Sequence, residues 1–127
     1  MPKNNEQISP LMQQLSTYIA TSLRRKLPPA VSERAKLRIV DTFAAMISGS
    51  RLLPGQQAIR YVKTLGGKAE AGIMGTKMVT SVANAALANG MFGHADETDD
   101  THPASLTHPG TSVVPAAMAI GEARCLT

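Results

Sequence analysis

The sequence predicts an all-α fold, a bundle of helices, on three observations. Apolar residues recur with helical spacing in several segments that begin at a proline or a capping residue. No segment shows the alternation of apolar and polar residues that is typical of a half-buried strand. Hydrophobic residues make up 43% of the 127 residues and aromatic residues only 3%, so aliphatic side chains must form the core between closely packed helices.

The first helix is expected to begin at Ser9 and Pro10, because serine is a good N-cap and proline suits the first helical position. Residues 1–8 before it are predicted to be a flexible leader, and residues 9–127 to form one helical domain. The helix should stop before Pro28. Its apolar residues recur every fourth position and form one stripe: Leu11, Leu15, Ile19 and Leu23.

The second helix should start at Pro28–Pro29 and end at Gly49, a candidate C-terminal cap. Its predicted buried face follows the helical spacing and comprises Val31, Ala35, Ile39, Val40, Phe43, Ala44 and Ile47. A shorter helix is expected over Pro54–Leu65, where Gly66 and Gly67 end it.

The second half of the chain predicts a short extended connector and two more helices. Residues 71–76 are too short and too rich in glycine for a helix, so they form the connector. Residues 78–91 carry mostly small side chains, which predicts a central buried helix that its neighbours approach closely. A last helix should start at Thr111 and Ser112, with Pro115 tolerable only in its first turn.

Charge and cysteine content exclude several classes of protein. Residues 1–68 hold 11 Lys and Arg against 3 Asp and Glu, and residues 69–127 hold 2 against 6. The basic residues lie at helix-surface spacing without interleaved aromatic residues, so we expect no nucleic-acid partner. No apolar stretch approaches the length of a membrane span, and no signal-peptide pattern is present. The single Cys125 cannot form an intramolecular disulfide bond, which favours a cytoplasmic protein.

Residues 93–112 form a polar segment with all three histidines and four of the nine acidic residues of the chain. One interpretation is a metal site, but the spacing Asp96-x-x-Asp99-Asp100 lacks the glycine and alternation of a calcium loop. No His-x-x-x-His pair lies on a clear helix either, so we predict no metal. A second interpretation is an exposed turn in which Asp99, Asp100 and Thr101 only cap helices.

The third interpretation is an acid/base site. Histidine both takes and returns a proton near neutral pH, and a carboxylate beside the ring fixes its tautomer. His108 comes just before the predicted last helix, whose free N–H groups and positive dipole end favour an anion. Gly110 leaves room for a ligand to approach the backbone there, next to Thr111. This arrangement favours proton transfer at a carbon next to a carboxylate group.

Residues 88–123, ANGMFGHADETDDTHPASLTHPGTSVVPAAMAIGEA, resemble the signature region of the MmgE/PrpD family. That family includes 2-methylcitrate dehydratase, cis-aconitate decarboxylase and iminodisuccinate epimerase. Its pattern is an alanine-rich helix ending in Asn-Gly, a His-Ala, an Asp-Asp-Thr, and a His-Pro before a helix of small residues. Two upstream segments are similar to the family as well: AKLRIVDTFAAMISGS at 35–50 and GIMGT at 72–76.

The resemblance implies a fold and a chemistry. Family members have a large all-α domain and a smaller α+β lid and are usually homodimers, so this chain would be the N-terminal part of the helical domain without the lid. Their decarboxylase and dehydratase members use histidines, lysines and an acid on a small polycarboxylate, without metal or organic cofactor. The resemblance therefore implies a lyase of dehydratase or decarboxylase type.

Site residues follow from the same resemblance, position by position. His108 matches the loop histidine of proton transfer, Thr101 a substrate-contacting hydroxyl, and Glu97 the acid of the decarboxylase motif; these are the predicted catalytic residues. The predicted substrate-binding residues are Asp99, Asp100, His102, Gly110 and Thr111. The chain has Glu97-Thr98 where the decarboxylases have Asp-aromatic, and one more residue between Thr101 and His108, so HADETDD is more similar to other members.

The family's second histidine and its lysines would lie beyond Thr127, so we expect this chain to be inactive alone. An alternative from another class stays open. The chain could be a non-catalytic helical fragment or split subunit that docks on a partner supplying the rest of the domain. Apolar helix faces built to meet absent helices would then be exposed to water.

Overall fold

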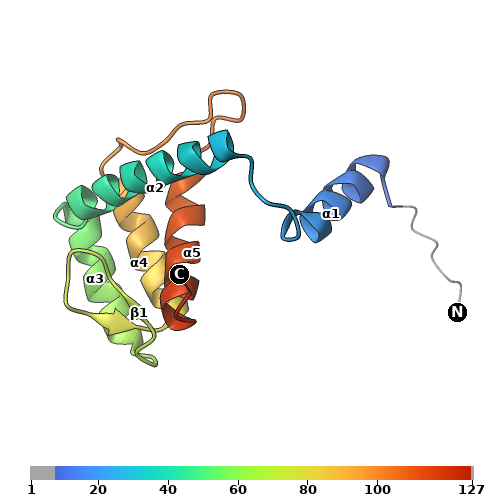
Figure 1. The fold of residues 1–127 in the computed structure, drawn as a ribbon. Helices are drawn as coiled ribbons and strands as arrows, with labels where there is room; N and C mark the ends of the chain where they lie inside the picture. The colour runs from blue at the N-terminus through green and yellow to red at the C-terminus, as the bar shows by residue number, and fades with distance from the viewer. Residues whose placement is uncertain (1–7, 127) are drawn as a thin grey trace, which may run out of the picture. The chain divides into compact units, whose positions relative to one another are not determined.

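Helices make up most of the computed structural model, which describes residues 8–126 (Figure 1). In this range they are α1 (Pro10–Ser22), α2 (Pro29–Gly49), α3 (Leu53–Leu65), α4 (Val82–Ala95) and α5 (Gly110–Ala123). The predicted all-α fold class is confirmed. Of the predicted leader only Ile8 is among the described residues. The chain divides into two units, one up to Glu33 and one from Arg34.

Helix α1 begins as predicted. Ser9 is its N-cap, whose side chain accepts a hydrogen bond from the backbone N–H of Met12 at 3.2 Å, and Pro10 is its first residue. The helix ends at Ser22, well before Pro28. Near this end the hydroxyls of Thr21 and Ser22 bond back to carbonyls of their own helix, a competition that weakens helix continuation.

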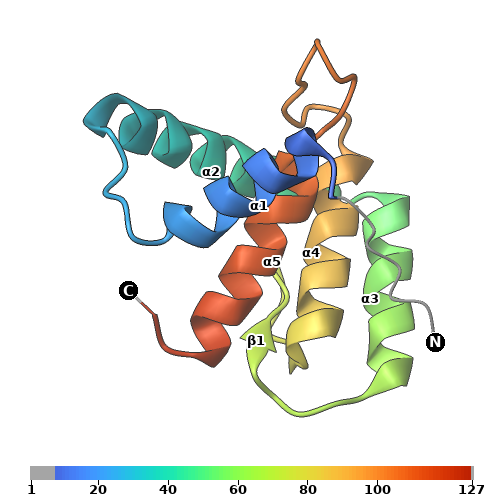
Figure 2. The ribbon, with the colours of Figure 1, turned by 90° about the vertical axis from the view of Figure 1, so that its right-hand side faces the viewer.

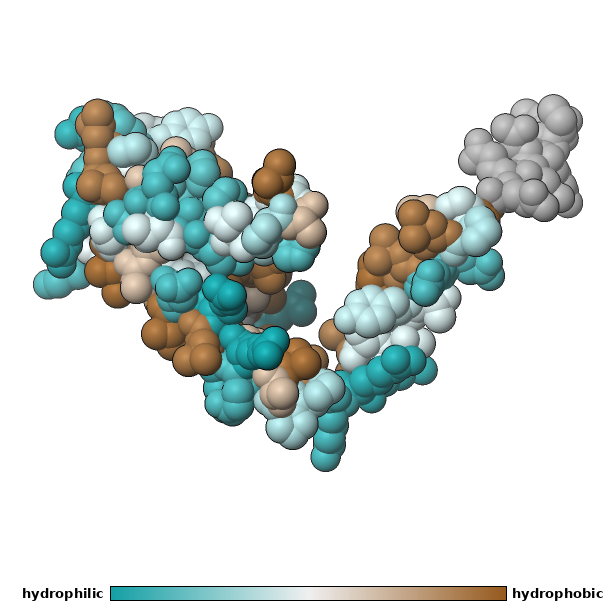
Figure 3. All heavy atoms as spheres, turned by 90° about the horizontal axis from the view of Figure 1, so that it is seen from above, coloured by the Kyte–Doolittle hydropathy of each residue, from teal (hydrophilic) through white to brown (hydrophobic). Residues whose placement is uncertain are grey.

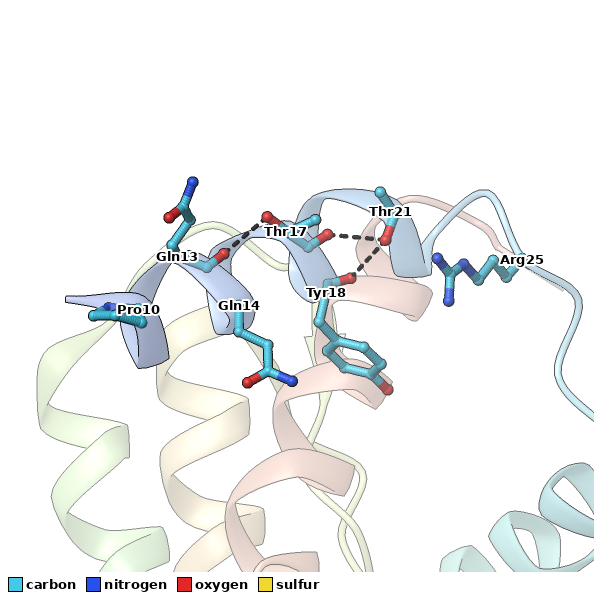
Figure 4. A pocket seen from close by; sticks show the side chains of 7 residues that line it. All are labelled: Pro10, Gln13, Gln14, Thr17, Tyr18, Thr21 and Arg25. Carbon is cyan, nitrogen blue, oxygen red and sulfur yellow. Dashed lines mark hydrogen bonds between the residues drawn. The ribbon is translucent and has the colours of Figure 1, made fainter. Parts of the chain in front are cut away.

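No residue of α1 is buried, so its predicted apolar stripe is exposed. On another face of α1 lies the shallow hollow of Figure 4, whose lining comes from this helix and the turn after it. There the hydroxyl of Thr17 donates to the carbonyl of Gln13 at 2.8 Å, and Thr21 donates to that of Thr17 at the same distance. The two threonine hydroxyls of this hollow are thus engaged by the backbone of their own helix.

Helix α2 has the predicted limits but not the predicted buried face. Ile39, Val40 and Ile47 are 40%, 65% and 47% exposed. The residues that the fold does bury also repeat at helical spacing, but they lie on a neighbouring face of the helix: Thr42, Ala45, Met46 and Gly49. The fold buries a face on which Met46 is the large apolar side chain and its neighbours are small.

Gly49 ends α2, as predicted, but for a different reason. The positive backbone φ angles among the described glycines are those of Gly66, Gly67 and Gly75, so Gly49 is not a left-handed cap. A Cβ atom at Gly49 would overlap the carbonyl oxygen of Phe92 in α4. The glycine is needed because two helix backbones approach each other there.

Helix α4 lies between α3 and α5 and packs against both (Figures 1 and 2). It starts at Val82, four residues later than predicted, because Val79 and Thr80 form strand β2 (Val79–Thr80) and Ser81 caps the helix. Strand β2 pairs antiparallel with β1 (Ala71–Gly72), the segment predicted as extended. The main core joins these elements to α2: Met46, Ala58, Val62, Ile73, Ala88 and Phe92.

Asn89 ties the hairpin of β1 and β2 to α4. Its side chain is fully buried, accepts from the N–H of Met74 at 2.9 Å and donates to the carbonyl of Gly72 at 3.1 Å. Glu122 of α5 holds the same segment from the other side, since its carboxylate accepts from the N–H of Gly72 at 2.6 Å. The connector therefore owes its position to side chains of two helices as well as to its own strand pairing.

We predict that Asn89→Leu lowers the free energy of unfolding by about 3 kcal/mol, because two backbone groups lose their partner inside the protein. Urea unfolding followed by circular dichroism measures the change. Asn84→Leu is the matched control, since the Asn84 amide donates to the carbonyl of Gly66 at an exposed position. The control should lose less than about 1 kcal/mol. Equal losses in the two variants would contradict a structural role for Asn89.

Pro115 is the sixth residue of α5 and is fully buried, so the prediction that it needs the first turn is wrong. Proline cannot donate the helix hydrogen bond to the carbonyl of Thr111. That carbonyl lies against α4, where a Cβ atom at Gly90 would come within 2.9 Å of it. Close contact with α4 thus accommodates the proline. None of the helices described here is long and apolar enough to cross a membrane.

Candidate active site

The polar segment of residues 96–109 connects two helices that lie side by side, α4 and α5 (Figure 2). This neighbourhood brings together histidines from the two ends of the segment. His94 belongs to the last turn of α4, and His108 comes two residues before α5. Their ring centroids are 5.9 Å apart, with the rings tilted by 57°.

The carboxylate of Asp99 lies between the two rings. Its Oδ2 atom is 3.3 Å from Nδ1 of His108 and 3.5 Å from Nδ1 of His94. The Asp99 side chain is only 3% exposed, whereas His108 is 39% and His94 63% exposed. Neither contact has hydrogen-bond geometry, and among the described residues Asp99 Oδ2 and His108 Nδ1 are buried without a hydrogen-bond partner. A buried acceptor and a buried ring nitrogen face each other with no competing partner.

Asp100 holds the start of α5. Its Oδ1 accepts a hydrogen bond from the backbone N–H of Gly110 at 2.8 Å. A Cβ atom at Gly110 would overlap this carboxylate and come within 2.8 Å of the Thr42 hydroxyl. The chain's own carboxylate thus occupies the helix start that the sequence predicted for a ligand. The room beside Gly110 is filled by Asp100 and Thr42.

His102 lies in a separate turn of the segment. Its backbone pairs with Thr107, and its Nδ1 is 2.7 Å from the hydroxyl of Ser105, which in turn is 2.8 Å from that of Thr107. The ring is exposed. No contact joins His102 to His94, Asp99 or His108 in the described structure, so the fold separates it from the other two histidines.

The remaining predicted residues border this cluster in different ways. Glu97 is exposed and has a left-handed backbone, φ 57°, directly after the cap of α4. Thr101 is exposed, and its hydroxyl bonds to no other described residue. The hydroxyl of Thr111 donates to the carbonyl of His108 at 2.8 Å, which links the histidine to the first turn of α5. The catalytic and binding roles of these residues stay predictions.

Sequence reasoning did not select His94 as a site residue. The signal that could have found it is its place on the last turn of a helix that packs beside the helix after His108. A shallow hollow of about 400 Å³ borders the ring between α4 and α5. The hollow is lined by Ala86, Leu87, Gly90, Met91, His94, Thr111 and Ser112. No group of three or more His, Cys, Asp or Glu within residues 8–126 is arranged to hold a metal ion.

A second groove of about 450 Å³ runs between α2 and α5. Its walls are almost entirely apolar and include Ile39, Phe43, Val113 and Met118, with Arg38 and Asp100 among the lining. Asp100 is thus shared between this groove and the start of α5. Two of the large apolar residues of α2, Ile39 and Phe43, line this groove, and Phe43 also packs against the core.

Comparison with known proteins places these features in a family context. The sequence model of the MmgE/PrpD N-terminal domain matches residues 13–127. The chain is also similar to the cis-aconitate decarboxylase-like protein oryM of Aspergillus oryzae (strain ATCC 42149 / RIB 40), with 27% identity over 109 residues. The matched region covers 86% of this chain and 23% of that protein. The chain therefore spans about a quarter of the length of this relative.

Proposed function

The chain belongs to the MmgE/PrpD family, and on that premise we propose that it forms part of a lyase for a small di- or tricarboxylate. The reaction is proton transfer at a carbon next to a carboxylate group, of dehydratase or decarboxylase type. The supporting relative carries a decarboxylase-like name, and the matched region covers 23% of its length. The proposal includes a homodimer as the assembled form.

The observation that carries the proposal is the pairing of His108 with Asp99. A carboxylate facing Nδ1 favours the neutral tautomer with its proton on Nδ1 and leaves the lone pair of Nε2 free to accept a proton. Burial of Asp99 strengthens this interaction, because the local dielectric is lower than in water. His108 keeps enough exposure to meet a ligand.

The other residues have supporting roles in this proposal. Thr101 offers an exposed, unengaged hydroxyl as a donor to the substrate, and Glu97 offers an exposed carboxylate from the same segment. Asp100 holds the segment to α5 through Gly110, and Thr111 holds the carbonyl of His108. A substrate carboxylate at this helix start would have to replace the carboxylate of Asp100 on the Gly110 N–H.

The experiment is solution NMR of the chain with citrate, cis-aconitate and methylcitrate in D₂O. We expect binding to shift the imidazole signals of His108, because a carboxylate beside the ring changes its environment. The signals of His102 should stay in place, because that ring lies in a separate turn. If none of these acids moves the His108 signals, the proposed substrate class is wrong.

Exposed apolar residues support a second candidate function, a non-catalytic helical subunit that docks on a partner. In the unit from Arg34 onwards, Leu37, Val40 and Val113 are 71%, 65% and 64% exposed. Figure 3 shows such apolar side chains among polar ones at the surface. Light scattering during size-exclusion chromatography distinguishes the two candidates. A monomer that binds a polycarboxylate contradicts the docking function, whereas oligomers without binding support it.

A further inference from the structure

His94 faces the same oxygen of Asp99 as His108 does, from the opposite helix. The two imidazoles are the polar groups that contact this carboxylate among the described residues. A carboxylate that is 3% exposed needs donors, because removing a charge from water is costly unless it is paired. His94 is therefore one of the two rings whose Nδ1 contacts Oδ2 of Asp99.

The exposed fractions of the three side chains indicate that the ring of His94 shields the carboxylate of Asp99 from water. Asp99 is buried, and the ring of His94 is 63% exposed, so this ring lies at the solvent side of the carboxylate. Without the ring, water would reach Asp99 and hydrate it. A hydrated carboxylate turns toward water and interacts less with Nδ1 of His108. Loss of His94 would thus act on His108 although the two rings are 5.9 Å apart.

We infer that His94 is a positioning residue, which holds Asp99 against His108 and thereby keeps the neutral His108 ring protonated on Nδ1. The inference rests on the proposed acid/base role of His108 for its functional meaning, but not for its test. In the family chemistry proposed above, His94 touches neither substrate nor reacting atoms. It acts through Asp99, in the way that outer partners orient a working histidine.

The side-chain chemistry of asparagine and glutamine separates this inference from a general effect on the fold. Asparagine places an amide N–H close to the position of Nδ1, whereas glutamine places its amide near the position of Nε2. His94→Asn therefore keeps an N–H group close to the place from which Nδ1 contacts Asp99, and His94→Gln and His94→Ala remove it. Because the His94 side chain is 63% exposed, all three variants should fold.

The experiment measures the ¹⁵N imidazole spectrum of the chain, which reports the tautomer of each histidine ring. The chain has three histidines, so three sets of signals must be assigned. We expect His108 to be mainly the Nδ1–H form in the natural chain and in His94→Asn. In His94→Ala and His94→Gln its Nε2–H fraction should rise at least twofold. His102→Ala is the control and should leave His108 unchanged, since Nδ1 of His102 contacts Ser105.

Each outcome decides the inference. An unchanged or larger Nδ1–H fraction of His108 in His94→Ala overturns it, and so does an equal change in His102→Ala. Recovery by asparagine but not glutamine supports it. The spectrum needs no turnover, so a failed substrate assay would count against the proposed function and leave the positioning role standing. A normal substrate assay together with an unchanged imidazole spectrum would count against the positioning role and leave the proposed function standing.

Discussion

His108→Ala is expected to slow turnover of a polycarboxylate substrate by about 10²–10⁴-fold, the range typical for loss of a group that transfers a proton. The reason is the contact of Asp99 with Nδ1, which favours the tautomer that leaves Nε2 of His108 free to accept a proton. His94 contacts the same oxygen from 3.5 Å, but its Nδ1 is the more distant one and its side chain is more exposed. The loss should appear in kcat more than in KM, because proton transfer occurs in the transition state.

The measurement needs a protein that contains the rest of the fold. A chimera in which residues 13–127 of this chain replace the matching part of the Aspergillus oryzae relative would supply it, and cis-aconitate is the first substrate to assay. His102→Ala in the same chimera is the matched control, because this exposed ring makes its contact within its own turn. Equal turnover of the His108→Ala chimera and its parent would remove His108 from the mechanism.

Gly49→Ala is expected to lower the free energy of unfolding by about 4 kcal/mol, the upper range of single substitutions. The added Cβ atom would overlap the carbonyl oxygen of Phe92, and neither backbone can yield without moving α2 away from α4. Phe92 and Met46, both fully buried, pack at this crossing, so a shift of the helices would open the core. The loss is a large part of the stability of a small domain, typically about 5–15 kcal/mol.

Gly121→Ala is the matched control for this substitution. Gly121 lies inside α5, and a Cβ atom there would meet nothing within 4 Å. Alanine at an open helical position should add about 0.5–1 kcal/mol of stability. Urea unfolding should show a lower free energy of unfolding for Gly49→Ala and a higher one for Gly121→Ala than for the natural chain. A stabilising effect at Gly49 would mean that the two helices are further apart than the structure has them.

Local chemistry made the ends of several elements predictable. Ser9 and Pro10 start α1, Pro29 starts α2, and Gly66 ends α3 with a positive φ of 65°, all as expected from the residues alone. A capping side chain or a proline acts on backbone groups within four residues, so its effect can be read without knowing the fold. The family membership was predictable for a related reason, because a long contiguous motif carries it.

Packing decided the features that the sequence did not predict. The predicted buried face of α2 is wrong, because Val40 and Ile47 are exposed and Ile39 lines an open groove, while Ala45, Met46 and Gly49 pack inside. Likewise, the helix start at Gly110 was expected to be free for a ligand, yet Asp100 occupies it. Ten residues separate these two positions, and nothing in their types says that the segment folds back so far.

The sequence by itself therefore determined where most helices begin and that one polar segment carries every histidine of the chain. The expected aliphatic core is mostly present, but Phe92 is its largest fully buried side chain. Only the tertiary structure decided which of those histidines meet. Side-by-side packing of α4 and α5 places His94 and His108 on one oxygen of Asp99, and the backbone pairing of His102 with Thr107 holds His102 in a turn of its own. The physical reason is range: capping and periodicity act within a turn or two of helix, whereas a contact between distant residues exists only once whole helices have packed.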